Sequence, residues 1–146
     1  MTRNYDSTDF LWTRRGDLIV DHKGDIGDTE HDPLRAKVQD IRDRISANKG
    51  DWKLYLNIGA GIGDFVGEPN TKETAENIKT RIISSLVGNN LINHSDLEVK
   101  YMPIDADKIM YRVKLAVAKT ARNGNSEEVF LDFLYSYSEN NVYRVD

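Results

Sequence analysis

The feature that most constrains the fold is an alternation of apolar and polar residues in the C-terminal third of the chain. Apolar side chains occupy every second position from Ile109 to Val117, and a dense apolar run extends from Val129 to Tyr137. Asn123-Gly124 lies between them and is typical of a two-residue hairpin turn, because both residues tolerate positive φ. The pattern predicts two antiparallel strands with one buried face. Shorter runs predict further strands at Leu97–Tyr101 and Val142–Val145.

Two amphipathic helices are predicted upstream of these strands. Asp32-Pro33 supplies a capping acceptor and a proline suited to the first turn of a helix. The apolar residues that follow recur at three- and four-residue steps until Asn48-Lys49-Gly50, and they are Leu34, Val38, Ile41 and Ile45. The charged residues expected on the solvated side are Arg35, Lys37, Asp40, Arg42, Asp43 and Arg44. Asn70 and Glu73 fit a capping box for the second helix, whose expected buried residues are Ala75, Ile78, Ile82 and Leu86.

The N-terminal part has weaker signals. Leu18–Val20 and Asp25–Asp28 flank a Lys23-Gly24 turn and predict a small hairpin, and we identify no internal repeat. Together the elements indicate an α+β fold, with two helices packed on one face of a small, mainly antiparallel sheet and an N-terminal hairpin. The length of 146 residues fits a single domain. We expect this domain to span residues 14–146, after an N-terminal arm over residues 1–13.

Composition narrows the possible functions. The chain has no cysteine, which excludes disulfides, a cysteine nucleophile and thiolate metal sites. Its formal net charge of −4 argues against a nucleic-acid partner, because phosphate binding needs clustered basic residues. Its apolar runs fall far short of the ~20 residues that cross a bilayer. No apolar stretch follows the first residues, so we expect neither a secretory signal nor direct membrane contact.

A glycine-rich segment follows the first predicted helix. Trp52, Leu54 and Leu56 alternate with other residues and predict a short strand. Glycine then recurs at Gly59, Gly61, Gly63 and Gly67. A dinucleotide-binding loop does not fit, because Asp64 stands where the third glycine is needed, and the Gly-Lys-Ser/Thr of a P-loop is absent. We therefore expect a tightly packed loop with positive-φ glycines and no cofactor.

We expect no catalytic residue and no metal site. His22 and His31 border an acidic stretch, but their spacing matches neither a helical i, i+4 pair nor a calcium loop. Asp64 and Glu68 are the best placed carboxylates for a glycosidase, which needs two carboxyl groups flanking the scissile bond. Carboxylates that cap turns are the simpler interpretation of this pair. No Gly-x-Ser-x-Gly element supports a serine nucleophile.

One stretch of the chain resembles a known family. Residues Gly50–Trp52, Asn57–Ile62 and Gly67–Asn70, with an apolar helix before and after, resemble the baseplate wedge or sheath-initiator family of contractile phage tails. Arg15–Leu18 followed by Asp25-Ile26 is similar to the opening hairpin of that family. Some of its members carry a lysozyme label.

Two positions depart from the family pattern. Asp51 replaces the more usual glutamate, and the Glu-Pro-Arg signature after the second helix is absent, since the chain reads Asn90–His94 there. The resemblance implies a structural component that is not an enzyme. Such proteins link the inner wedge to the first sheath ring, and they nucleate sheath assembly when arms of sheath subunits pair with their sheet.

The resemblance also implies partners and a location. The partners would be the tail sheath protein and other baseplate wedge proteins, with several copies of this chain per tail. The protein would reside in the tail baseplate of the virion, after assembly in the host cytoplasm. A peptidoglycan-cleaving, lysozyme-like tail enzyme is the alternative function, and a free-standing binding domain is a third.

Three segments are candidates for partner binding. The first is the aromatic cluster of the arm, and the second is a Glu-Pro before the second helix, as in the family. The third is the last predicted strand, which either pairs back on Val129–Tyr137 and is complete or receives a donated strand at its edge. The candidate residues are Phe10, Leu11, Trp12, Glu68, Pro69, Val142, Tyr143, Arg144 and Val145.

Overall fold

The computed structural model of the chain describes residues 8–13, 17–30, 32–118, 126–139 and 141–145. The helices of this part are α1 (Pro33–Ser46) and α2 (Lys72–Val87), with short 3-10 turns at η1 (Ile62–Phe65), η2 (Gly88–Asn90) and η3 (His94–Asp96). Its strands are β1 (Leu97–Pro103), β2 (Lys108–Ala118), β3 (Ser126–Ser136) and β4 (Asn141–Val145). The turn expected at Asn123-Gly124 lies outside the described residues.

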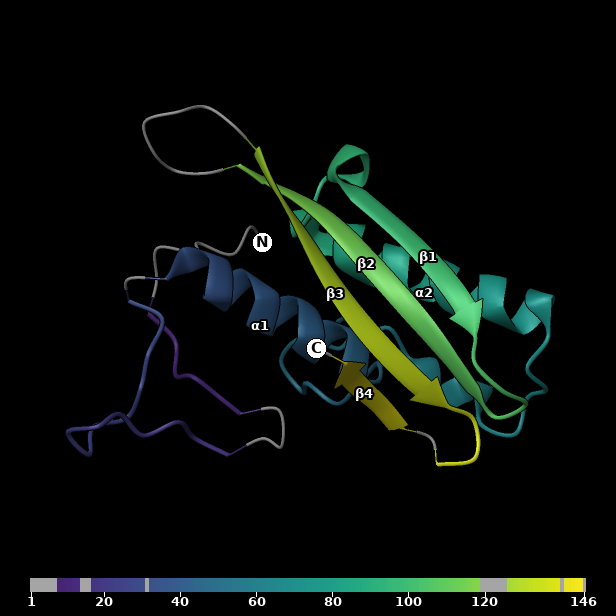
Figure 1. Cartoon of the computed structure of the whole chain (residues 1–146), viewed down its shortest axis with the longest axis horizontal. Helices are drawn as coiled ribbons and strands as arrows, with labels where there is room; N and C mark the ends of the chain where they lie inside the picture. The colour runs from purple at the N-terminus through teal and green to yellow at the C-terminus, as the bar shows by residue number, and fades with distance from the viewer. Residues whose placement is uncertain (1–7, 14–16, 31, 119–125, 140, 146) are drawn as a thin grey trace.

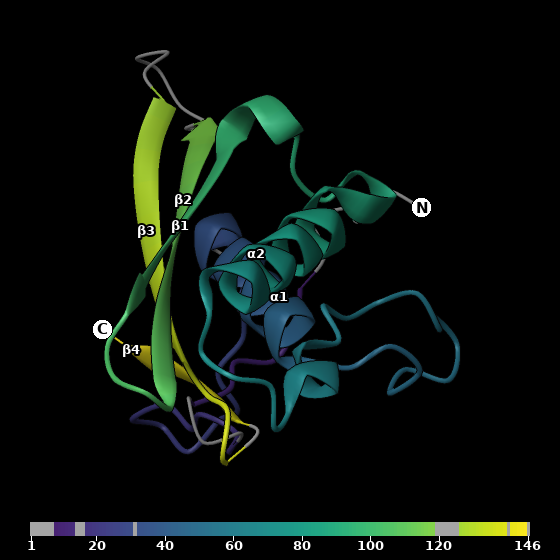
Figure 2. The same cartoon turned by 90° about the vertical axis from the view of Figure 1, so that its right-hand side faces the viewer.

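The strands form an antiparallel sheet in the order β1-β2-β3-β4. β2 and β3 lie at its centre and pair from Lys108↔Ser136 to Ala118↔Ser126. Figure 1 looks onto one face of the sheet, and Figure 2 shows that both helices cover the opposite face. The expected α+β fold is therefore confirmed. Neither α1 nor α2 is long and apolar enough to cross a membrane.

Alternate side chains of the sheet face the helices and form the core. Tyr111 donates its hydroxyl hydrogen to the carbonyl oxygen of Ala75 (3.1 Å), and Tyr135 donates to that of Ile62 (3.3 Å). Burial raises the pKa of Tyr135 to about 12. The other large, fully buried side chains are Phe133, Ile41, Ile45, Ile78, Ile82, Leu86, Ile109, Leu115 and Val113. The core thus joins both helices to the three longer strands.

The glycine-rich segment packs against the end of α1. The N–H of Ala60 donates to the carbonyl oxygen of Arg44 (2.9 Å), and the N–H of Gly61 donates to that of Ala47 (3.2 Å). The loop thereby satisfies carbonyl groups that a helix leaves open at its C-terminus. Gly59 has a φ of +123°, and a Cβ at this position would lie 2.7 Å from the carbonyl oxygen of Ala47. The prediction of a tightly packed loop with positive-φ glycines is confirmed.

Two local predictions between the helices are wrong. Trp52–Leu56 forms consecutive turns and not a strand, since hydrogen bonds within the segment replace pairing with another chain segment. The N-cap of α2 is Thr71, whose hydroxyl accepts from the N–H of Thr74 (3.2 Å). Asn70, the expected cap, instead donates its side-chain amide to the carbonyl oxygen of Asp105 (2.6 Å).

The N-terminal segment folds into a closed unit, which we call the N-terminal triangle. Residues 9–13, 17–21 and 25–29 form its three sides. Each side bridges both others in antiparallel fashion, at Phe10↔Asp28, Trp12↔Leu18 and Val20↔Ile26. The expected hairpin is one pair of sides. Residues 9–13, which the sequence analysis assigned to an N-terminal arm, form one side of this unit, and residues 1–7 lie outside the described part.

Backbone hydrogen bonds relate the three sides by an eight-residue repeat. The N–H of Leu11 donates to the carbonyl oxygen of Gly27 (2.9 Å), that of Gly27 to Ile19 (2.7 Å), and that of Ile19 to Leu11 (3.0 Å), which closes the circle. A second set of three bonds follows the same spacing and joins the ends of neighbouring sides: the N–H of Thr13 donates to the carbonyl oxygen of Asp17 (2.8 Å), that of Asp21 to Asp25 (2.8 Å), and that of Thr29 to Asp9 (2.9 Å). The chain therefore contains an internal repeat that the sequence analysis missed.

Helix α1 is packed on more than one side. It contacts α2, β4 and the N-terminal triangle. Asp40 and Arg44 were expected on a solvated face, but both side chains are buried. The guanidinium of Arg44 donates to the carbonyl oxygen of Gly88 (3.4 Å) and lies 3.9 Å from the carboxylate of Asp40. The expectation was wrong because a single apolar stripe does not reveal a second packed side.

The packing at Gly59 generates a prediction for stability. A non-glycine residue with positive φ costs roughly 1–2 kcal/mol, and at Gly59 a Cβ would also overlap the backbone of α1. We expect Gly59→Ala to lower the free energy of unfolding by more than about 2 kcal/mol, as measured by urea denaturation. Gly67, with a φ of +80° and open space around it, is the matched control. Equal losses in Gly59→Ala and Gly67→Ala would contradict the close approach.

Candidate protein-binding interface

β4 forms one edge of the sheet. It pairs with β3 from Ser136↔Asn141 to Asp132↔Val145, and no described strand pairs with its other side. Val142 packs against the core, whereas Tyr143 and Val145 are exposed on the outer face. The hydroxyl of Tyr143 donates to the carboxylate of Glu139 in the preceding turn. The last strand therefore pairs back on β3, which was one part of the first of the two alternatives. Among the described strands, none pairs with its outer main-chain edge.

The turn that leads into β4 is held by one carboxylate. Asp107, between β1 and β2, accepts from the N–H of Ser138 (2.7 Å) and from the hydroxyls of Ser136 (2.7 Å) and Ser138 (2.8 Å). The side-chain bonds from these two serines hold the pKa of Asp107 below its usual value. Since Asp107 lies in a different turn, these bonds connect both turns at this end of the sheet and fix where β4 begins.

Glu68 and Pro69 lie at the same end of the molecule. They are exposed, between η1 and α2, and the next residue, Asn70, donates to the Asp105 carbonyl oxygen in the β1–β2 turn. That turn also carries Asp107, which binds the turn before β4. The structure therefore connects two of the three expected partner-binding segments through one turn.

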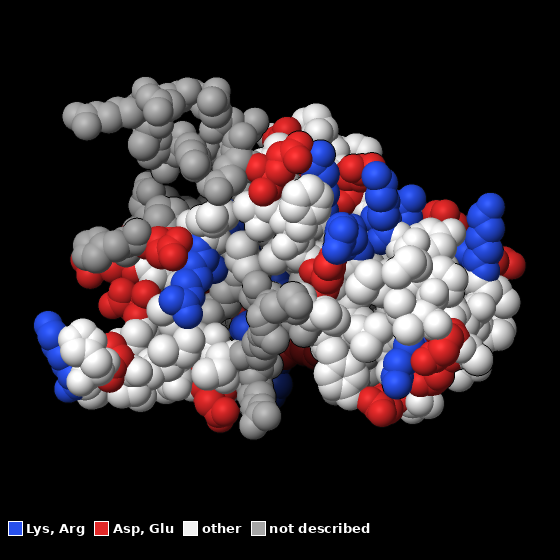
Figure 3. Space-filling model, in the orientation of Figure 1, with Lys and Arg blue, Asp and Glu red and all other residues white. Residues whose placement is uncertain are grey.

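The outer face of the sheet continues from β4 without interruption. Met102, Met110, Leu134 and Tyr143 are cross-strand neighbours and form an apolar row across all four strands. The next row holds Arg112 and Asp132, whose guanidinium and carboxylate meet through two hydrogen bonds of 2.8 and 2.7 Å. These bonds lower the pKa of Asp132. Figure 3 shows this face, with charged side chains beside a broad uncharged area.

The aromatic cluster near the N-terminus lies apart from this end and is held on α1. Phe10 and Trp12 are exposed, but Leu11, the third residue of this cluster expected to bind a partner, is 7% exposed and packs inside the triangle, so its side chain does not lie on this surface. Gln39 of α1 accepts from the N–H of Trp12 (3.1 Å) and donates to the carbonyl oxygen of Phe10 (2.9 Å). Its side-chain amide thus satisfies one donor and one acceptor of this backbone, as the edge of a neighbouring strand does.

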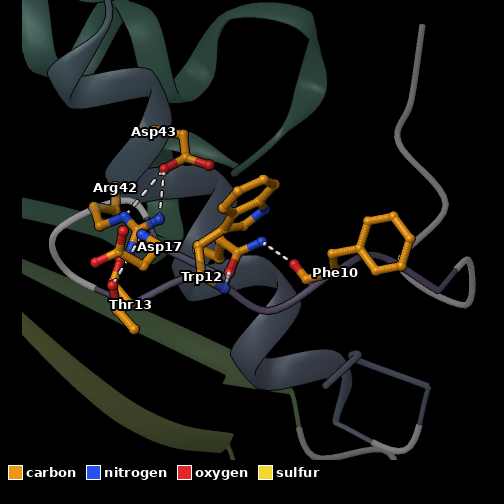
Figure 4. Close-up of polar contacts among 7 residues, drawn as sticks. Phe10, Trp12, Thr13, Asp17, Arg42 and Asp43 are labelled. Carbon is orange, nitrogen blue, oxygen red and sulfur yellow. Dashed lines mark hydrogen bonds and ion pairs between the residues drawn. The ribbon is translucent and has the colours of Figure 1, made fainter. Parts of the chain in front are cut away.

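A second contact holds the triangle on α1. The guanidinium of Arg42 donates to the carbonyl oxygen of Thr13 (3.3 Å) and, through two nitrogens, to the carboxylate of Asp43 (3.0 and 2.9 Å) (Figure 4). Burial raises the pKa of Asp43, and Arg42 partly offsets this effect. A shallow cleft of about 210 Å³ lies between Trp12, Ile19 and this part of α1.

The sequence analysis missed one exposed apolar segment. Trp52, Leu54, Tyr55 and Leu56 lie on the turns after α1 and are all exposed. The N–H of Gly50 donates to the carbonyl oxygen of Leu56 (3.1 Å) and closes the base of this loop. The glycines that border this run could have indicated an excursion from the core rather than a strand.

The residues considered for catalysis are not assembled into a site. Asp64 is bound to Arg81 at 3.0 Å and its side chain is 67% exposed, while Glu68 is exposed on the next turn. A glycosidase acid is typically enclosed by apolar groups. Within the described ranges, no three His, Cys, Asp or Glu side chains are grouped so that they could hold a metal ion.

Comparisons with known proteins give little further direction. No protein-family model and no solved structure matches the chain. A stretch of 69 residues is 30% identical to the chloroplastic argininosuccinate lyase of Arabidopsis thaliana. This stretch covers 44% of this chain and 13% of that enzyme. The match therefore spans about an eighth of the lyase and assigns neither its family nor its activity to this chain.

The amide of Gln39 generates a prediction about the triangle. Gln39→Glu replaces the amide N–H that donates to the carbonyl oxygen of Phe10 by a carboxylate oxygen, with almost no change in side-chain volume. The two oxygens then repel each other, and the carbonyl oxygen loses its donor. We expect the backbone amides of residues 9–29 to exchange with deuterium at least tenfold faster than in the wild type, with β2 and β3 unaffected. Ser46→Ala, at an exposed position of the same helix, is the control. Unchanged exchange in Gln39→Glu would show that this amide does not hold the triangle.

Asp107 generates a prediction for pH dependence. The pKa of Asp107 is lower in the folded chain than its ordinary value of 3.8. As pH falls, the unfolded chain therefore takes up this proton at a higher pH than the folded chain does. The stabilisation is therefore present at neutral pH and is lost as pH falls through the folded pKa. We expect Asp107→Asn to lower the unfolding midpoint at pH 7 and the difference from the wild type to shrink below pH 3.8. A difference independent of pH would contradict this role.

Proposed function

We propose that this chain is a structural component of a contractile phage-tail baseplate, which links the inner wedge to the first sheath ring. Its sheet nucleates sheath assembly by pairing with an extended arm of the sheath protein at β4. Several copies would act in each tail of the virion, after assembly in the host cytoplasm. The proposal rests on the resemblance of Gly50–Asn70 and its flanking elements to the wedge or sheath-initiator family.

The observation that carries the strand-pairing step is the position of β4. It is five residues long, it lies at the edge of an antiparallel sheet, and the Asp107 contacts fix the turn before it. Such an edge presents a row of main-chain donors and acceptors in a fixed geometry, and a donated strand can complete them. The exposed segment Glu68-Pro69, connected to the same turn, is the proposed contact with other wedge proteins.

The outer face adds a requirement on the donated strand. The residue of the donated strand that lies opposite Tyr143 would extend the apolar row that runs from Met102 through Leu134. Directly opposed apolar side chains stabilise strand pairs by a few tenths to about 1 kcal/mol. We therefore expect an apolar or aromatic residue at that position of the sheath arm, where it would cover Tyr143.

Proline substitutions in β4 test the proposal. Successive N–H groups of a strand point to opposite sides. Of the two substitutions Tyr143→Pro and Arg144→Pro, one therefore removes the N–H that points toward β3, and the other removes the N–H that points toward the open edge. The variant that lacks the β3-facing donor should unfold at a lower temperature. The variant that lacks the edge donor should keep the wild-type unfolding midpoint and give at least tenfold fewer sheathed tails, counted by electron microscopy.

Two further variants complete this test. Tyr143→Phe and Arg144→Ala keep every backbone donor, and both should give normal numbers of sheathed tails. Sheathed tails in normal number from the proline variant that retains the wild-type unfolding midpoint would contradict strand pairing at β4.

A further inference from the structure

The N-terminal triangle exposes an unusual amount of apolar surface. Side chains alternate between the two faces of each side, so Leu11, Ile19 and Gly27 share one face and converge, with the Cβ position of Gly27 3.5 Å from Leu11 and 3.6 Å from Ile19. The other face carries five large apolar side chains, each between 38% and 59% exposed. These are Phe10, Trp12, Leu18, Val20 and Ile26.

This face is preorganised. A circle of three backbone hydrogen bonds and three further bonds between the ends of the sides close the triangle, and the Gln39 amide and the Arg42 guanidinium hold it on α1. Aromatic and aliphatic side chains on an ordered backbone lose little conformational freedom when a partner covers them. Clustered apolar exposure of this kind marks interaction surfaces in proteins.

The charge around this face selects the kind of partner. Residues 9–32 contain seven carboxylates and three Lys or Arg residues, so this segment carries the entire formal net charge of −4 of the chain. Carboxylates lie at or beside two of the three corners: Asp21 accepts from the N–H of Lys23 (2.7 Å) and of Asp25 (3.0 Å), and Asp28, near the end of the third side, accepts from that of Glu30 (2.9 Å). These local bonds fix acidic groups beside the apolar face.

We infer that the outer face of the triangle binds a basic amphipathic segment of another protein, with apolar side chains on Phe10, Val20 and Ile26 and Lys or Arg beside the acidic corners. A second copy of this chain would bring acidic corners together and be repelled. Nucleic acid and anionic membranes carry the same sign of charge as the corners. This inference is independent of strand pairing at β4.

A titration with designed peptides tests the inference on the full chain. Trp52→Phe leaves Trp12 as the fluorescent reporter, next to its bridge partner Leu18. The probe is a synthetic 18-residue helix of Lys and Leu at amphipathic spacing, and its counterpart has Glu in place of Lys. We expect the Lys/Leu peptide to change Trp12 fluorescence saturably, with affinity falling as salt rises, and the Glu/Leu peptide to bind at least tenfold more weakly.

Variants in the same background locate the binding. Val20→Ser/Ile26→Ser removes apolar surface and should weaken the Lys/Leu peptide at least tenfold. Leu54→Ser, at another exposed apolar site, should leave the affinity unchanged. Asp25→Asn/Asp28→Asn tests the charge without altering the apolar face, and it should weaken binding severalfold at low salt only.

Three results would overturn the inference. One is equal binding of the Lys/Leu and Glu/Leu peptides, which would indicate adhesion without charge selection. Another is unchanged affinity in both double variants, each shown to be folded by its unfolding midpoint. The third is loss of binding in Leu54→Ser, which would place the peptide on the loop after α1.

Discussion

The pairing of β2 with β3 is the constraint on which the remaining structure depends. Its register, with Tyr111 opposite Phe133 and Val113 opposite Leu131, places one continuous set of large side chains beneath the helices. A shift of β3 by one residue would turn its own apolar side chains to the outer face and bring Asp132 into the core. The same register fixes the positions of β1 and β4 at the two edges. The candidate interface at β4 is therefore a consequence of how the centre of the sheet is packed.

The sequence predicts these elements because their periods are long and regular. Alternation over β2 and three- and four-residue spacing along both helices each identify a buried face, and the structure confirms them. The N-terminal triangle could not be predicted in the same way. Its hydrogen bonds join Leu11, Ile19 and Gly27, which are spaced by eight residues and share no side-chain type. A search for aspartates at that spacing, at Asp9, Asp17 and Asp25, could have revealed the repeat.

Side-chain polarity was the less reliable guide at the candidate sites. Asp40 and Arg44 are charged yet buried, because α1 is enclosed from more than one direction and a carbonyl oxygen meets the arginine. Leu54 is apolar yet exposed, on a loop that the Gly50–Leu56 backbone bond closes. In both places tertiary contacts, which a local pattern does not contain, decide the burial. The candidate partner-binding residues differ in the same way: the outer edge of β4 is unpaired among the described strands, whereas the side chain of Leu11 is buried.

The energetics of strand pairing explain why the open edge of β4 would not be sufficient to bind a partner stably. A five-residue strand offers only a few outward backbone hydrogen bonds, each with a net value of about 0.5–1.5 kcal/mol. Association costs roughly 4–15 kcal/mol in lost translational and rotational freedom. The edge of β4 alone would therefore select the geometry of a partner without holding it firmly. Apolar surface must supply the remainder, and the sheet provides it in the row that ends at Tyr143. The triangle, packed on α1, offers a separate apolar surface with a charge of its own, and a second contact of this kind raises the effective concentration of partners at the first.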